Sequence, residues 1–367
     1  MTTTPLGSPT RGYSPPASAT AAQQRPRRRQ RRDNDDDDDH GTRRLPQAKR
    51  ARNGLGTLPE NPLAFYKEPR GTFQIATWNV AGLRSCNAEK WKFGFRLYVE
   101  AEDPHILAIT EVNEQDPDSV FETDPNFEFL RERYPYRYWS SKVAIVSKQR
   151  PVSDPVYGFP SGTRYDPADA RARALTLEFE SCFLVATYVP NSGAEFKRLA
   201  RRQDWNADFE PHLRALDAQK PVIWTGDFNV VRTVDPQDRN STESNDLQWP
   251  QNMGQVAGTH QVERDAHERL LGPQPWLSDP KRPGPLFVDV WRLIHGPGWR
   301  QYTHSSKKLG GWRLDGFIVS ERFLWRIRKC EIRQDVKRKF WPAKDVVKLG
   351  ALSDHWPVWL SLELESL

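Results

Sequence analysis

Between Phe73 and Leu367, short runs rich in β-branched and aromatic residues alternate with longer helix-like segments, and no repeat unit recurs. Several of the short runs are continuously apolar, which is typical of strands that are buried on both faces. The pattern predicts an α/β fold, a four-layer α/β sandwich in which two mixed β-sheets pack face to face and helices lie outside. The predicted strands are Phe73–Val80, Ile106–Glu111, Val143–Ser147, Ala174–Phe179, Phe183–Pro190, Pro221–Val230, Leu286–Trp291, Trp312–Ser320, Glu331–Val336 and His355–Leu362. The predicted helices are Lys90–Ala101, Glu195–Leu216 and Arg264–Leu271.

The N-terminal part of the chain has a different composition. Residues 1–70 are rich in Ser, Thr, Pro, Arg and Asp and poor in large apolar side chains. Such a segment buries too little apolar surface to offset its chain entropy, so we expect a disordered tail there and one catalytic domain over residues 71–367. The tail carries 14 Lys/Arg and 8 Asp/Glu, whereas the remainder carries 40 of each. Any anion-binding face of the domain must therefore come from a local arrangement of side chains.

Two basic clusters of the tail, Arg25–Arg32 and Arg43–Arg52, stand on either side of the acidic run Asp35–Asp39. This spacing is typical of a bipartite nuclear-import signal, so we predict a nuclear protein. One alternative is a solvated segment that carries no targeting signal. The other is a mitochondrial presequence, because residues 1–32 contain no acidic side chain.

The composition excludes several classes of protein. The three cysteines show no CxxC spacing, which argues against a disulfide scaffold or a zinc site built from cysteines. No run approaches the roughly 20 apolar residues of a membrane span, so we expect no membrane contact. Neither a phosphate-binding P-loop nor a Gly-x-Ser-x-Gly motif occurs, so nucleotide-triphosphatase and serine-hydrolase functions have no support. We expect a monomer.

Acids, amides, a phenol and one imidazole end several of the predicted strands, next to a turn. Charged groups at such positions are costly unless they pair with one another or bind a metal ion. Their recurrence at strand ends predicts that they converge on one cleft. The alternative is that each is a separate cap, turn former or ion pair. The residues are Asn79, Glu111, Tyr188, Asn191, Asp227, Asn229, Asp315, Asp354 and His355.

This set suits the hydrolysis of a phosphodiester bond. The hard oxygens of Glu111 and Asp354 are ligands that Mg²⁺ prefers, with Mn²⁺ as the alternative ion. Asp315 can orient His355 and raise its proton affinity. Asp227 and its neighbouring amide can position or deprotonate water. Neutral donors to phosphate oxygens are available from Asn79, Asn191 and Tyr188.

Six motifs in combination resemble the exonuclease III type of apurinic/apyrimidinic (AP) endonuclease, in the endonuclease/exonuclease/phosphatase superfamily that includes DNase I. The resemblance covers about residues 73–367. It implies the DNase I-like sandwich and a Mg²⁺-dependent phosphodiester hydrolase of base excision repair. The expected substrate is DNA with abasic sites, cut on their 5′ side, with 3′-phosphodiesterase or exonuclease activity as a further expectation. The motifs are Trp-Asn-Val-x-Gly-Leu-Arg at 78–84, Tyr-Val-Pro-Asn-x-Gly at 188–193, Arg-Gln-x-Trp at 202–205, Gly-Asp-x-Asn-Val at 226–230, Gly-Trp-Arg-Leu-Asp at 311–315 and Ser-Asp-His-x-Pro at 353–357.

The resemblance also implies a role for each matching residue. Glu111 would bind the metal, with Asp354 and Asn79 beside it. Asp227 would activate water or protonate the leaving 3′ oxygen, and Asn229 would orient that group. Contacts to phosphate and DNA would come from His355 held by Asp315, from Tyr188, Asn79, Asn191 and Arg173, and from Trp312 as a wall of the pocket for a flipped abasic sugar.

The chain departs from the family pattern at several places. Ala81 stands where the family usually has an Asp, and the loss of an acid there would weaken or shift Mg²⁺ binding. Thr110 stands where a Gln usually precedes the metal-binding Glu. A Gly-Tyr-Ser-Gly segment that normally contacts DNA is absent between Trp139 and Val143. The aromatic stretch before Gly-Trp-Arg-Leu-Asp is shortened to residues 302–308, which predicts a different abasic pocket.

An inserted run of cations and aromatics, Lys337–Lys344, precedes Asp354. Such a composition can neutralise phosphates and stack on bases, so we predict that Arg338, Lys339 and Trp341 contact DNA in place of the absent segment. The alternative is a solvated loop whose Trp341 packs on the domain.

Other charged residues receive a weaker interpretation. Asp246 is predicted to lie in a surface loop. The helix face with Lys197, Arg198, Arg201 and Arg202 is predicted to be partly solvated and partly in contact with the side of the DNA.

Two other functions also stay open. The chain is then another DNase I-like nuclease, non-specific or derived from a retroelement, or a nucleic-acid-binding module that does not cleave.

Overall fold

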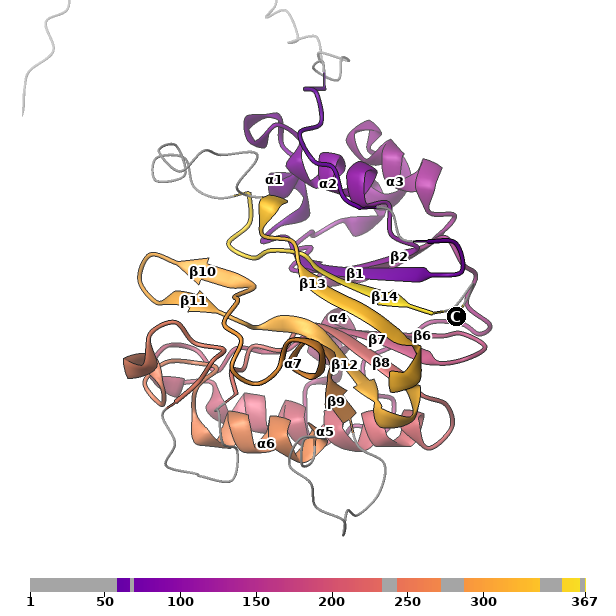
Figure 1. The fold of residues 1–367 in the computed structure, drawn as a ribbon. Helices are drawn as coiled ribbons and strands as arrows, with labels where there is room; N and C mark the ends of the chain where they lie inside the picture. Colours follow the sequence, from indigo (N-terminus) through magenta and orange to yellow (C-terminus); the bar gives the residue numbers. More distant parts are fainter. Residues whose placement is uncertain (1–57, 67–68, 233–242, 272–286, 337–351, 364–366) are drawn as a thin grey trace, which may run out of the picture. The chain divides into compact units, whose positions relative to one another are not determined.

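The strands form two mixed sheets and one small hairpin (Figure 1). The computed structural model describes residues 58–66, 69–232, 243–271, 287–336, 352–363 and 367. Within these residues the first sheet has the order β13-β14-β1-β2-β4-β3, the second has the order β5-β6-β7-β8-β12-β9, and β10 pairs with β11. The strands are β1 (Phe73–Asn79), β2 (Ile106–Thr110), β3 (Tyr136–Trp139), β4 (Val143–Ser147), β5 (Val156–Tyr157), β6 (Ala174–Glu178), β7 (Phe183–Tyr188), β8 (Val222–Asp227), β9 (Phe287–Asp289), β10 (His304–Ser306), β11 (Gly310–Trp312), β12 (Asp315–Ser320), β13 (Ile327–Ile332) and β14 (Val358–Leu362). The helices are α1 (Leu83–Cys86), α2 (Gly94–Glu102), α3 (Glu128–Arg133), α4 (Pro167–Arg173), α5 (Leu199–Asp217), α6 (Gln261–Leu271) and α7 (Val290–His295).

The two sheets pack face to face because alternate residues of their strands point into a shared core. Ile75 of β1 and Ile145 of β4, from the first sheet, belong to one buried cluster with Leu184 of β7 and Phe317 of β12 from the second. On β1, Trp78 points to the opposite face and belongs to a different buried cluster. Both faces of the central strands are therefore apolar, which explains their continuously apolar sequences.

Helices cover the outer face of each sheet (Figure 1). Phe95 of α2 and Leu130 of α3 pack in the same cluster as Trp78 of the first sheet. On the second sheet, the ring centroid of Phe209 from α5 lies 4.8 Å from that of Trp224 on β8. Helix, sheet, sheet and helix thus form four layers, and the predicted α/β sandwich is confirmed.

Several predicted strand boundaries are wrong. The strand expected over Trp312–Ser320 is divided between β11, which ends at Trp312, and β12, which begins at Asp315. The strand expected over Leu286–Trp291 stops at Asp289, where α7 follows directly. The carboxylate of Asp289 caps this helix by accepting a hydrogen bond from the backbone N–H of Arg292 at 3.2 Å. Apolar periodicity alone does not separate a short strand from a short helix, and the cap decides the outcome. The strand expected over Glu331–Val336 lies earlier, at Ile327–Ile332.

Part of the segment predicted as a tail packs on the domain. Asn61 Nδ2 donates to the carbonyl of Leu97 at 2.8 Å, and Leu63 is buried in the cluster that contains α2 residues. The described elements belong to one unit that spans residues 54–367. Both basic clusters of the tail and the acidic run between them lie outside the described residues. None of the described helices is long and apolar enough to span a membrane.

Candidate active site

The strand register brings the polar strand ends together. In the first sheet, β1 and β2 run parallel, so Asn79 and Glu111 lie at neighbouring carboxyl ends. In the second sheet, β7 and β8 run parallel with Tyr188 opposite Asp227. Strand β12 runs antiparallel to β8, which places its first residue, Asp315, opposite Asp227. Residues that are scattered in the sequence therefore share one end of the two sheets.

A buried amide links the two sheets at this end. Asn79 Nδ2 lies 3.0 Å from Glu111 Oε1 and 3.0 Å from Asp227 Oδ2. Asn79 Oδ1 is held in turn by the backbone N–H of Ala81 at 3.1 Å. The asparagine side chain thus has a fixed orientation and keeps one carboxylate of each sheet in the same site.

A carboxylate–imidazole pair lies beside this bridge. Asp315 Oδ2 is 2.7 Å from His355 Nδ1, and both residues are buried. The Ser353 hydroxyl accepts from the His355 backbone N–H at 3.0 Å and donates to the carbonyl of Asn79 at 2.7 Å. Burial alone would lower the pKa of His355, but the charge and hydrogen bond of Asp315 outweigh it and raise the pKa to about 10. His355 is therefore a cation at neutral pH.

The His355–Asp315 pair predicts a pH-dependent stability. The folded pKa of His355, about 10, exceeds its ordinary value of 6.5, so the stabilising contribution is complete below pH 6.5 and is lost as pH rises through 10. Between about pH 6 and pH 10, wild type should lose about 1–3 kcal/mol more unfolding free energy than His355→Gln, because the variant cannot lose this proton. Urea unfolding at both pH values measures the difference. Equal losses in the two proteins would contradict the prediction.

Asp227 is a carboxyl group that favours its protonated form. Burial raises its pKa most, and the neighbouring carboxylates of Asp315 and Glu111 add to the effect, while His355 opposes it. The result is a pKa of about 8. Asp227 Oδ1 accepts from the backbone N–H of Asn229 at 2.9 Å, which fixes the group in place. Such a group can hold a proton near neutral pH and release it to an oxygen within reach.

The loops after β7 and β8 are held by a buried arginine that the sequence did not reveal. Asn191 Nδ2 donates to Asn229 Oδ1 at 3.2 Å, which joins the two loops. Arg202 of α5 donates to three carbonyls in the same loops, Pro190 and Asn229 at 3.0 and 3.2 Å and Phe228 at 3.1 Å. The prediction that Arg202 lies on a partly solvated helix face is wrong, since only 3% of it is exposed.

Tyr188 and Arg173 form one side of the site. The Arg173 guanidinium lies 4.8 Å from the centre of the Tyr188 ring and donates to the Tyr188 carbonyl at 3.2 Å. It also pairs with Asp169 at 2.7 Å, so its charge is partly neutralised. Burial, together with the charges of Glu111 and Asp227, raises the pKa of Tyr188 well above its usual range. The phenol therefore stays protonated and is available as a donor.

A tight turn occupies the position of the absent glycine-rich segment. The Ser140 hydroxyl accepts from the backbone of Val143 at 3.0 Å and donates to the carbonyl of Ala172 at 2.7 Å. The turn places Lys142 Nζ 3.1 Å from the Asn113 side chain, which itself contacts Glu111 at 3.3 Å. A cation that the sequence gave no reason to select thus lies one amide away from the proposed metal ligand.

The remaining predicted residues lie in different surroundings. Asp354 has half of its side chain exposed and contacts His304, 3.3 Å away, rather than an acid of the site. Trp312 is only 3% exposed, packs with Leu247 and Leu314 among other apolar side chains, and donates from its indole to a backbone carbonyl. The loop residues predicted to contact DNA, Arg338, Lys339 and Trp341, lie outside the described residues.

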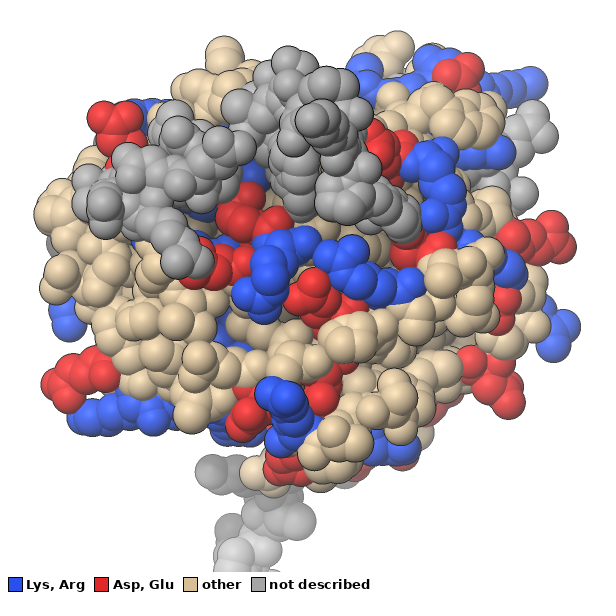
Figure 2. Space-filling view, turned by 90° about the horizontal axis from the view of Figure 1, so that it is seen from below, with Lys and Arg blue, Asp and Glu red and all other residues tan. Residues whose placement is uncertain are grey.

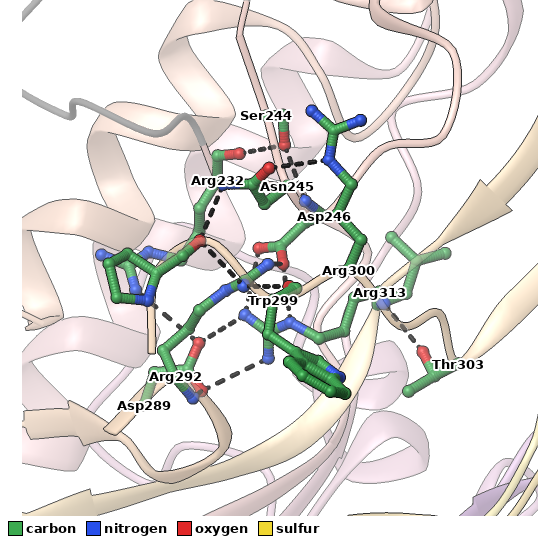
Figure 3. Close-up of polar contacts among 12 residues, drawn as sticks. Arg232, Ser244, Asn245, Asp246, Asp289, Arg292, Trp299, Arg300, Thr303 and Arg313 are labelled. Carbon is green, nitrogen blue, oxygen red and sulfur yellow. Dashed lines mark hydrogen bonds and ion pairs between the residues drawn. The ribbon is translucent and has the colours of Figure 1, made fainter. Parts of the chain in front are cut away.

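A buried ion-pair network supports the strand that carries Asp315 (Figure 3). Arg313 binds Asp246 through two nitrogens at 2.7 and 3.0 Å, and also pairs with Asp289. Arg292 pairs with Asp246 as well, and Arg232 lies 3.6 Å from Asp289. The prediction of Asp246 as a surface-loop residue is wrong, since it is 2% exposed. The residues that pair with Asp246 are distant in sequence, so the polar sequence around Asp246 did not indicate that it is buried.

The outer face of α5 and α6 does not gather charge of one sign. Figure 2 shows basic and acidic side chains interspersed over the side of the molecule seen from below. On this pair of helices, Glu210 accepts from both Arg214 at 3.1 Å and Arg269 at 3.3 Å. Arg201 of α5 pairs with Asp169 of α4 at 2.7 Å. Cations that are paired in this way provide little net attraction for a phosphate backbone.

Known nucleases resemble this chain in sequence and in fold. The profile of the Endonuclease/Exonuclease/phosphatase family matches residues 76–355. Recombination repair protein 1 of Drosophila melanogaster is 30% identical over 87% of this chain, which spans 41% of that relative's length. An exodeoxyribonuclease of Bacillus subtilis (strain 168) is 29% identical over 79% of this chain and 100% of its own. The solved structure of an AP endonuclease from Archaeoglobus fulgidus aligns with a TM-score of 0.57 and 22% identity over 78% of this chain and 98% of that one, which supports the fold.

Proposed function

Because this chain belongs to the endonuclease/exonuclease/phosphatase family, we propose that it is a metal-dependent DNA endonuclease that cuts on the 5′ side of abasic sites. The observation that carries the proposal is the Asn79 bridge between Glu111 and Asp227, next to the Asp315–His355 pair. A metal-binding carboxylate, a proton donor and a cation thus lie in one site, as phosphodiester hydrolysis requires. The names of the repair protein and the exodeoxyribonuclease among the relatives support DNA as the substrate and exonuclease cleavage as a further activity.

The described residues fit a divalent cation. The oxygen Asp315 Oδ1 is buried without a hydrogen-bond partner in the described part of the chain. The carboxylates of Asp315 and Glu111 also raise the pKa of Asp227, which is a sign of excess negative charge. Glu111 would hold the ion through its carboxylate oxygens, which suit Mg²⁺ or Mn²⁺. Asn79 was predicted beside the ion, but its oxygen accepts from the Ala81 N–H and its amide nitrogen faces Glu111. The bound ion would neutralise charge on the phosphate in the transition state.

Each of the other side chains of the site has its own role in the reaction. Water adds to the phosphorus atom and releases one proton to the solvent while the P–O3′ bond breaks, and Asp227 donates its proton to the leaving 3′ oxygen. The amide of Asn229 keeps Asp227 oriented. The imidazolium of His355 binds a phosphate oxygen, and Tyr188 and Asn191 donate hydrogen bonds to the others. The resemblance implies further DNA contacts from Arg173 and Trp312, and the composition of the inserted run predicts contacts from Arg338, Lys339 and Trp341.

A single assay tests the proposed function against its alternatives. A labelled duplex with one tetrahydrofuran abasic analogue is incubated with the protein in Mg²⁺ or in EDTA. One cut 5′ of the analogue, only with Mg²⁺, is the expected result. Cuts scattered along both strands would instead show a general nuclease. Binding without cleavage would show a nucleic-acid-binding module, the alternative that Ala81 favours because its methyl group binds no metal.

Restoring an acid at position 81 should strengthen metal binding. Ala81 is exposed and has a φ of +49°, a conformation that aspartate tolerates. Its backbone N–H holds Asn79, so an Ala81→Asp carboxylate would enter the surroundings of Glu111. We expect the Mg²⁺ concentration for half-maximal cleavage to fall by about tenfold. Ala81→Asn, which has the same shape without the charge, is the control, and an equal fall in both variants would contradict the electrostatic explanation.

We also propose that the N-terminal tail directs the protein to the nucleus and that the protein is a monomer. A further proposal is that the inserted loop Lys337–Lys344 binds DNA. Replacing Arg338, Lys339 and Lys344 together by Ala should weaken DNA binding and flatten its salt dependence, because phosphate contacts release counterions. Fluorescence anisotropy at several salt concentrations measures both effects. Unchanged affinity at low salt would exclude the loop as a DNA contact.

A further inference from the structure

A second group of potential ligands lies beside the proposed catalytic residues. His304 pairs with His355 across an isolated antiparallel bridge, and the centroids of their rings are 4.7 Å apart. His304 Nε2 lies 3.3 Å from Asp354 Oδ2. One potential ligand atom from each of His304, Asp354 and His355 lies within 4.8 Å of the other two. His304 has no part in the proposed reaction and belongs to the shortened stretch at 302–308.

Each imidazole has a nitrogen that is not engaged by the carboxylate beside it, Asp315 for His355 and Asp354 for His304. His355 Nδ1 is bound to Asp315, which leaves its Nε2 free of that carboxylate. An imidazole whose other nitrogen binds a carboxylate is the usual form of a histidine metal ligand. His304 Nδ1 is buried and has no hydrogen-bond partner among the described residues. A buried nitrogen without a partner is unfavourable. The other ring nitrogen of His304, Nε2, is the one that faces Asp354 and is the ligand atom of the group.

The chemistry of these ligands differs from that of the Glu111 site. Glu111 offers carboxylate oxygens, which suit Mg²⁺. Two imidazoles and one carboxylate are a donor set found in protein sites for Zn²⁺ and other borderline-soft ions. Asp354 contacts His304, and the clusters of three potential ligands in the described residues that contain Asp354 do not include Glu111.

We propose that His304, Asp354 and His355 form a second cation site that prefers Zn²⁺ or Co²⁺ over Mg²⁺. The binding itself is independent of the proposed function, and only its effect rests on that function. In a DNA-cleaving enzyme, a divalent ion bound here would take the place of the imidazolium proton as the positive charge beside the scissile phosphate. His304 is then the residue that gives this chain a transition-metal site next to its Mg²⁺ site.

The test uses the full-length, EDTA-treated protein without DNA. Titration with Co²⁺ should produce the visible absorption of a nitrogen-ligated ion, and calorimetric titration with Zn²⁺ should show a matching site. His304→Phe, which keeps an aromatic ring, should lose the absorption and weaken Zn²⁺ binding at least tenfold. Glu111→Gln, the matched control, should retain both. Circular dichroism and thermal unfolding establish that the variants are folded.

Three results would overturn the proposal. Wild-type protein could show no visible Co²⁺ absorption, His304→Phe could retain it, or Glu111→Gln could lose it. None of these readouts depends on cleavage of DNA. Failure of the abasic-site assay therefore leaves the binding result intact, and failure of the binding test leaves the proposed nuclease intact.

Discussion

Replacement of Asp227 or His355 by Ala is expected to abolish cleavage of abasic duplex, with a loss of at least about 1,000-fold in kcat/KM. Asp227→Ala removes the group that keeps a proton near neutral pH, and His355→Ala removes the cation held by Asp315. Both groups act on charge that develops in the transition state, so kcat should fall while affinity for the duplex changes little. Single-turnover kinetics with the tetrahydrofuran duplex measures the loss.

Controls separate lost chemistry from lost structure. Arg269→Ala changes an exposed side chain of α6 and should leave cleavage within about twofold of wild type. Circular dichroism should show the same fold in all three variants. Cleavage by either active-site variant within about tenfold of wild type would remove that residue from the proposed mechanism.

Replacement of Arg313 by Met is expected to destabilise the protein strongly. Arg313 is buried and pairs with both Asp246 and Asp289. The variant leaves these two carboxylates in a buried site with less compensation, which typically costs about 3–5 kcal/mol. Chemical denaturation at neutral pH measures the free energy of unfolding. Because Asp315 follows two residues later, we also expect reduced cleavage in the folded fraction.

The matched control for Arg313→Met is Arg269→Met, which removes an exposed arginine that also pairs with an acid, Glu210. Exposed ion pairs contribute little, so this variant should stay within about 0.5 kcal/mol of wild type. A loss of less than about 1 kcal/mol in Arg313→Met would mean that water or rearranged side chains compensate the two carboxylates.

The sequence predicted most of the sheet architecture because strand patterns are local. The run Val143–Ser147 has the same bounds in the sequence prediction and in β4. Asn79 stands next to the end of a predicted strand, whereas Asp227 and Asp315 lie inside two others. In the structure all three stand at strand ends, and these ends meet at one end of the sandwich. Short elements such as α7 were not predicted, because a single side-chain cap at Asp289 outweighs the apolar pattern around it.

By itself, the sequence determined which segments become strands and which chemical groups stand at their ends, because both depend on the order of neighbouring residues. Tertiary structure alone decided the contacts between distant segments. Arg313 meets an acid 67 positions away, and Arg202 of α5 turns inward to hold the loops after β7 and β8. His304 faces His355 only because β10 lies beside the segment that leads into β14. The free energy of burying a charge or an imidazole depends on the partner it finds in three dimensions, and that partner is absent from the local pattern.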